Sequence, residues 1–79
     1  MLIRSQNKQN IFNLDTICGV FLNYIGTKCK KCKLFVAADR EYTLGIYSSE
    51  EDALCVLDMI ENAVRMNEKV FHMPLEEEL

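Results

Sequence analysis

The sequence predicts an α+β domain, in which a curved antiparallel sheet of four to five strands is covered on one face by a single C-terminal helix. Two observations carry this prediction. Before residue 48, short runs of β-branched, aromatic and aliphatic residues alternate with polar ones and are separated by turn residues. From Ser49 to Met66, apolar residues recur every three or four positions, which is the spacing of one helix face. A partly open, barrel-like sheet is the alternative form.

We expect one domain over residues 1–74, followed by an acidic tail over residues 75–79 that frays. The 79 residues of the chain are too few for two independent cores, and a domain of this size buries only about 60% of its unfolded surface. The composition, 49% hydrophobic and 27% charged, is typical of a folded globular domain. Small domains of this kind often gain stability from a metal, a disulfide or a second subunit.

Three strands are predicted in the first third of the chain. Leu2–Ser5 and Asn10–Leu14 flank a polar turn and are expected to form a hairpin. The third strand, Thr16–Tyr24, is apolar on both of its alternating faces. One face carries Cys18, Val20, Leu22 and Tyr24, and the other carries Ile17, Phe21 and Ile25. A strand that is apolar on both faces is expected at the centre of a sheet.

The candidate interface residues follow from this third strand. A single helix can cover only one face of the sheet, so Ile17, Phe21 and Ile25 need a second cover. Phe35 extends the same apolar set. Because exposed contiguous apolar surface usually marks an interaction site, we expect a homo-oligomer or a protein partner at these residues.

Two further strands and a turn are predicted in the middle of the chain. Gly26 fits a tight turn, because glycine adopts positive φ without strain. A fourth strand follows, with Cys32, Leu34 and Val36 alternating with Lys33 and Phe35. The fifth strand covers Glu41–Tyr47, with Tyr42, Leu44 and Ile46 expected on one face. Gly45 marks a bulge in this strand or a close approach of the helix.

The helix has a clear start signal. Ser48 and Glu51 fit a capping box, in which each side chain satisfies a backbone N–H at the helix start. The predicted apolar stripe consists of Ala53, Val56, Leu57, Ile60, Ala63 and Val64. After the helix, Val70–Met73 is extended and adds an edge to the sheet, and Pro74 opposes any further helical turn.

Cys29 and Cys32 form the one recognisable chemical motif, a CxxC pair with the spacing of a zinc knuckle. A complete zinc site needs two more ligands. Cys18, Cys55 or His72 would have to converge on the pair, or a second subunit would have to supply its own. The alternative is a lysine-rich loop with incidental thiols. A redox role is disfavoured because the pair leads into a strand and not into a helix N-terminus.

The segment Lys28–Lys33 is basic, and Tyr24 and Phe35 lie near it, a combination suited to weak binding of single-stranded nucleic acid. The net charge of −3 favours instead a solvated hairpin tip and makes nucleic acid the less favoured partner. The chain shows no phosphate-binding glycine loop and no serine–histidine–aspartate arrangement, so we expect neither an enzyme nor a small-molecule substrate.

The sequence favours a cytoplasmic location. The N-terminus turns polar after three residues and lacks the apolar region of a secretory signal. The longest near-apolar run, residues 17–22, is far shorter than the roughly 20 residues that span a bilayer. We therefore expect no membrane association. The four cysteines are expected to stay reduced.

Three stretches carry a resemblance to known proteins: residues 3–6, residues 44–51 with the helix that follows, and residues 71–74. Over these stretches the chain resembles a group of small, uncharacterised proteins of low-GC Gram-positive bacteria and their phages or mobile elements. The similarity spans both ends and is thin from Val20 to Arg40, where Cys29 and Cys32 lie. It implies a strand, a capped helix and a terminal extended segment, and it implies no activity or cofactor.

These observations favour a small cytosolic protein-interaction module that self-associates through its sheet. A zinc-stabilised module built on Cys29 and Cys32 is one alternative. A weak single-stranded nucleic-acid binder using Lys28–Lys33 is the other.

Overall fold

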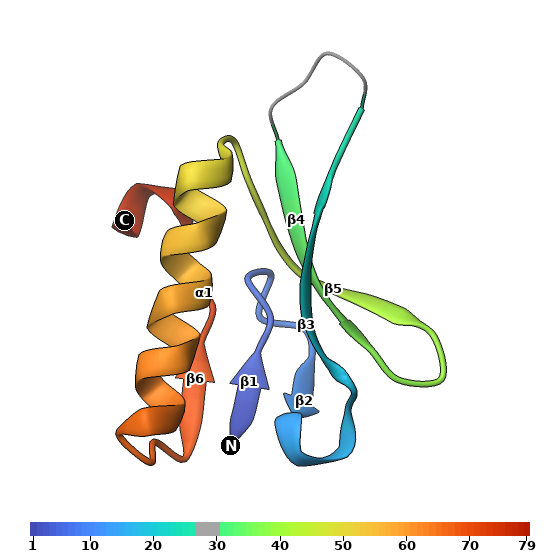
Figure 1. Cartoon of the computed structure of the whole chain (residues 1–79), viewed down its shortest axis with the longest axis vertical. Helices are drawn as coiled ribbons and strands as arrows, with labels where there is room; N and C mark the ends of the chain where they lie inside the picture. The colour runs from blue at the N-terminus through green and yellow to red at the C-terminus, as the bar shows by residue number, and fades with distance from the viewer. Residues whose placement is uncertain (27–30) are drawn as a thin grey trace.

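The computed structural model describes residues 1–26 and 31–79 and shows an α+β fold (Figure 1). Within these residues there are six strands, one α-helix and two short 3-10 helices. In chain order they are β1 (Leu2–Arg4), β2 (Ile11–Asn13), η1 (Leu14–Thr16), β3 (Gly19–Tyr24), β4 (Cys32–Ala37), β5 (Glu41–Tyr47), α1 (Glu50–Arg65), β6 (Val70–His72) and η2 (Glu76–Glu78). The α+β class is therefore confirmed, and each predicted strand and the helix are present, but the third strand begins at Gly19 and not at Thr16.

The strands form two separate three-stranded sheets, in the orders β2-β1-β6 and β3-β4-β5. The prediction of one curved sheet is therefore wrong, and the described residues form no closed or curled barrel. The predicted β1–β2 hairpin is present and antiparallel. β6 adds an edge as expected, but it pairs with β1 in parallel. Alternation of apolar residues shows which face of a strand is buried but not which strand it pairs with. The division into two sheets therefore could not be predicted from the local sequence.

A bulge in β5 changes which residues share a face. Leu34 pairs with Gly45 and Phe35 pairs with Thr43, so Leu44 is an extra residue in β5. An extra residue in one strand shifts the alternation beyond it. Leu44 is 1% exposed whereas Ile46 is 45% exposed. The predicted bulge near Gly45 is confirmed, and the prediction that Leu44 and Ile46 share a face is wrong.

The helix α1 begins one residue later than the capping prediction placed it. The hydroxyl of Ser49, not Ser48, accepts a 3.1 Å hydrogen bond from the backbone N–H of Asp52. Ser48 instead donates both its backbone N–H and its hydroxyl to the carboxylate of Glu76. The C-terminal residues, for which the sequence predicts fraying, thus include a 3-10 helix that contacts the start of α1.

One hydrophobic cluster joins the helix to both sheets. In Figure 1, α1 lies on one side of the view and the β3–β4–β5 sheet lies on the other. The buried residues of α1 are Ala53, Val56, Ile60 and Ala63. All but Ala63 share a cluster with Ile3 of the first sheet and Leu34 and Leu44 of the second. Val64, predicted in the buried stripe, is 56% exposed. No helix within the described ranges combines the length and the apolar character needed to cross a membrane.

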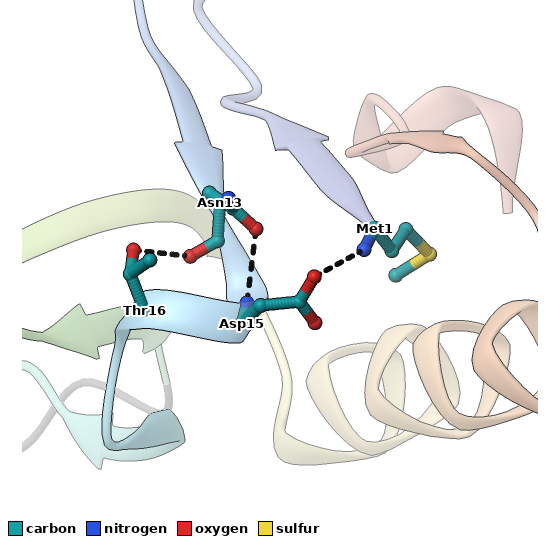
Figure 2. A network of polar contacts seen from close by, with 4 residues as sticks. All are labelled: Met1, Asn13, Asp15 and Thr16. Atoms are coloured by element: carbon teal, nitrogen blue, oxygen red, sulfur yellow. Dashed lines mark hydrogen bonds and ion pairs between the residues drawn. The ribbon is translucent and has the colours of Figure 1, made fainter.

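The connection between the two sheets is a polar turn that is fixed to the N-terminus (Figure 2). The side-chain oxygen of Asn13 accepts a 3.0 Å bond from the backbone N–H of Asp15, and the Thr16 hydroxyl donates to the Asn13 carbonyl. The carboxylate of Asp15 lies 3.6 Å from the amino group of Met1. This turn sets the point at which the chain leaves β2 and enters the second sheet.

Candidate interface on the outer face of the second sheet

The centre of the candidate interface is a pair of aromatic rings. Phe21 of β3 lies directly opposite Phe35 of β4. Their ring centroids are 5.6 Å apart and their planes are inclined by 29°, which is a stacked arrangement. Phe21 is 44% exposed, and Phe35 is half-buried. Both rings lie on the face of the sheet away from the core, because the neighbouring residues Leu34 and Val36 are fully buried.

A cation and an aliphatic side chain extend this aromatic pair. The ammonium of Lys33 lies 5.4 Å from the centroid of the Phe35 ring, within the range of a cation–π contact. Ile46 of β5 pairs with Lys33 and is 45% exposed. We call the set Phe21, Phe35, Lys33 and Ile46 the outer patch. It combines an apolar centre with a polar margin, which is the usual composition of a protein interface.

The sequence-predicted interface residues are only partly brought together. Phe21 and Phe35 meet, as described above. Ile17 is half-buried and packs against the hydrophobic core, so it does not belong to the outer patch. The reason is a bend at residues 17–18, after which β3 begins at Gly19, so the alternation assumed over Thr16–Tyr24 is broken.

Ile25 follows the end of β3. Its backbone N–H donates a 3.0 Å hydrogen bond to the carbonyl of Lys31, which continues the β3–β4 pairing by one residue. Its side chain is half-buried. Ile25 therefore marks the end of the ladder that presents Phe21.

Ile46 is the residue of the outer patch that the sequence analysis missed. Alternation along β5 predicts that it shares a face with Tyr42 and Leu44. The bulge at Leu44 reverses that orientation. Gly45 was the signal that could have identified it, because a glycine inside a strand often accompanies a bulge.

The CxxC pair is only half described. Cys29 lies outside the described residues, as do Lys28 and Lys30 of the basic segment. Cys32 is fully buried in the core cluster, and its burial, with a smaller contribution from the Glu50 charge, raises the pKa of its thiol. A raised pKa disfavours the thiolate that zinc requires. In residues 1–26 and 31–79, no group of three or more histidine, cysteine or acidic side chains is placed to hold a metal ion.

Cys18 and Cys55 do not join Cys32 in a metal-binding cluster within the described residues. Cys18 and Cys55 are both exposed, whereas Cys32 is buried. His72 lies on β6 and is exposed. Within the described residues, the predicted extra zinc ligands Cys18, Cys55 and His72 therefore do not form a set of three metal ligands with Cys32.

The far end of β3 is attached to the start of the helix. The hydroxyl of Tyr24 donates a 2.8 Å hydrogen bond to the carboxylate of Glu50. This bond, together with the negative charge of Glu50, raises the pKa of Tyr24. The contact holds the strand that carries Phe21 against the rest of the domain.

Comparison with protein-family models, with curated proteins and with solved structures gives no match to this chain. The resemblance to small proteins of low-GC Gram-positive bacteria and their phages stays a prediction. Function is therefore inferred from the residues of the chain itself.

Proposed function

We propose that this chain is a small cytosolic protein-interaction module that self-associates through the β3–β4–β5 sheet. The observation that carries the proposal is the stacked Phe21–Phe35 pair, of which Phe21 is 44% exposed on the outer face. Large aromatic side chains are enriched in interfaces and often dominate their energetics. A second copy in contact with Phe21 would bury part of the apolar surface that α1 leaves open.

The outer patch contributes apolar surface that favours association. Full burial of a phenylalanine or isoleucine side chain is worth about 1.5–3 kcal/mol. Phe21 is close to half exposed, so it gains further burial in a complex. Aromatic pairs add about 0.5–1.5 kcal/mol beyond burial. Since both copies contribute Phe21, these gains count twice against the entropic cost of association.

The direct test is a charge placed at the centre of the patch. Phe21→Glu should convert an oligomer into a monomer, because a carboxylate cannot be buried there without a partner. Leu54→Glu is the matched control, since Leu54 is 46% exposed but lies on α1. Sedimentation velocity over a range of concentrations should show association for the wild type and for Leu54→Glu, and none for Phe21→Glu. Circular dichroism should show that both variants fold.

A different pattern would refute this location. The other sheet also exposes apolar residues, with Leu2 paired to Val70 and exposed fractions of 41% and 43%. If Val70→Glu abolishes association and Phe21→Glu does not, the interface lies on the β2–β1–β6 sheet. A wild-type protein that is monomeric at every concentration would refute self-association itself.

One observation favours nucleic acid as a second candidate ligand. Lys33 lies over the Phe35 ring beside the exposed Phe21, which supplies a cation and a stacking surface together. Binding of a single-stranded oligonucleotide would weaken steeply with salt and would be lost in Lys33→Ala. Absence of binding at low salt would exclude it.

The zinc alternative depends on Cys29 and Cys32. It requires stoichiometric zinc and a loss of stability on chelation. An unchanged zinc content and melting temperature in the Cys29→Ser/Cys32→Ser double variant would exclude it.

A further inference from the structure

β3 is an edge strand with one hydrogen-bonding side open. Within the described residues it pairs only with β4. The N–H of Ile25 bonds the carbonyl of Lys31, and hydrogen-bonded pairs alternate along an antiparallel ladder. The backbone groups of Phe21 and Asn23 therefore face β4, and those of Val20, Leu22 and Tyr24 face the open side.

The other sheet edges are protected, and that of β3 is not. The backbone N–H of Gln6 donates to the Leu44 carbonyl at 2.7 Å, and its side-chain oxygen accepts from the Ile46 N–H at 3.0 Å, so Gln6 covers the edge of β5. β2 and β6 have three residues each. β3 has six residues, with no charge and no proline. Proteins that stay monomeric usually place charges, proline or short strands at their edges.

We infer that β3 pairs antiparallel with β3 of a second copy, across a two-fold axis that passes beside Phe21. This inference rests on the proposed self-association and specifies its geometry. A strand edge without charge can meet a copy of itself without opposing like charges. Two-fold symmetry is also the commonest arrangement in homo-oligomers.

The register follows from one side-chain contact. The N–H of Tyr24 already donates a 2.9 Å hydrogen bond to the side-chain oxygen of Asn23, so it is occupied. Val20 and Leu22 remain as the residues with both backbone groups facing the open side. When Val20 pairs with Leu22 of the second copy, the backbone N–H and C=O of both residues form hydrogen bonds between the copies. The two-fold axis generates the equivalent pair between Leu22 and Val20 of the second copy. A register centred on Leu22 would pair Val20 with Tyr24, whose N–H is occupied. A register centred on Val20 would pair Leu22 with residue 18, which lies outside β3.

This register places Phe21 opposite Phe21 of the second copy. The two residues form a non-hydrogen-bonded pair, with Cβ atoms about 4.5–5.5 Å apart. Each ring already stacks on Phe35 of its own chain. The result is a row of aromatic rings across one continuous sheet, to which each copy contributes three strands.

Residue-resolved amide hydrogen exchange on the wild-type protein tests this geometry and leaves Phe21 intact. The chain of 9.2 kDa is small enough for assignment by NMR. The Val20 and Leu22 amides should exchange at least about tenfold more slowly at concentrations that form the dimer than at dilutions at which the wild-type protein is monomeric. A dimer that forms through Phe21 but leaves these two amides unprotected would overturn the edge pairing while the proposed function stands. Absence of any dimer would overturn both.

A disulfide test fixes the register. In a Cys18→Ser/Cys55→Ser background, Gly19→Cys/Asn23→Cys keeps Phe21 and should form a linked dimer on oxidation, because residue 19 lies opposite residue 23 of the second copy. Mass spectrometry of the linked peptide identifies the bond. Asn23→Cys alone is the control, because it lies opposite Gly19 and not opposite its own copy. Linking of Asn23→Cys alone through residue 23, or no link between residues 19 and 23 in the double variant, in a protein that shows the amide protection, would overturn the axis at Phe21.

Discussion

The hydroxyl of Tyr47 donates a 2.8 Å hydrogen bond to the backbone carbonyl of Pro74. This bond joins β5 to the segment that follows β6. The side-chain amide of Gln6 donates to the same carbonyl at 3.3 Å. Tyr47 is fully buried, and burial, with smaller contributions from Glu76 and Glu78, raises its pKa to about 12. The C-terminal segment is thus held by a buried polar contact.

Tyr47→Phe should destabilise the fold by about 0.5–1.5 kcal/mol, because it removes one buried hydrogen bond and leaves the packing in place. Urea unfolding measures the change. Tyr42→Phe is the control, since its hydroxyl makes an exposed 3.1 Å bond to Asp39 and should matter less. Equal changes in unfolding free energy for the two substitutions would show that the buried Tyr47 bond stabilises the fold no more than the exposed Tyr42 bond does.

The stabilising effect of Tyr47 should be lost at alkaline pH. Its folded pKa of about 12 lies above the ordinary value of 10.0, so the folded state holds the phenolic proton more tightly. The contribution is complete below pH 10.0 and is lost as pH rises through about 12. The difference in unfolding free energy between wild type and Tyr47→Phe should therefore shrink over this range. A difference that stays constant up to pH 12 would contradict the assignment.

Gly45→Ala should destabilise the protein by about 1–3 kcal/mol through overpacking. A Cβ at this position would lie 3.2 Å from Cβ of Gln6 and 3.3 Å from the Tyr47 ring. Gly19→Ala is the matched control, because its added methyl group meets the Phe21 ring at an ordinary 3.5 Å. Denaturant unfolding of both variants gives the comparison, and a larger loss for Gly19→Ala would refute the close approach at Gly45.

Ser49→Ala should destabilise the protein by about 1 kcal/mol, the usual cost of losing an N-cap. Its hydroxyl satisfies the Asp52 N–H, whereas Ser48 bonds Glu76. On heating, the helix signal in circular dichroism should therefore be lost at a lower temperature in Ser49→Ala than in Ser48→Ala. The reverse order would restore Ser48 as the cap.

The contact between Ser48 and Glu76 should be lost in acid. The Ser48 hydroxyl and N–H lower the pKa of the Glu76 carboxyl below its ordinary value of 4.5. A lowered folded pKa stabilises the folded state above pH 4.5, and the effect disappears as pH falls through the lowered value. Glu76→Gln should lower the melting temperature at neutral pH but not in acid. The control Glu77→Gln, an exposed neighbour, should have little effect at either pH.

The sequence predicted the elements well because their signals are local. Both ends of α1 were placed within one residue, and β5 was predicted with the bounds that it has. These predictions depend on periodicity and turn residues, which act over a few positions. Ser48 and Ser49 both fit a capping pattern, however. A contact of Ser48 with Glu76, 28 residues away, decides between them.

The candidate site was predicted less completely, because it depends on long-range pairing. Phe21 and Phe35 were identified from their apolar character, and the register of β3 with β4 brings them together. Ile17 was assigned to the same face by alternation, but the bend before Gly19 directs it to the core. Ile46 was missed because the bulge at Leu44 reverses its face. Alternation holds only while the strand is regular.

The central claim is that the chain associates with itself through Phe21. Native mass spectrometry of the wild-type protein, purified without added metal, tests it most directly. We expect a metal-free dimer whose population rises with concentration and is unaffected by chelator, and a monomer for Phe21→Glu under the same conditions. A wild-type monomer at every concentration, or a dimer that carries zinc and dissociates on chelation, would contradict the account.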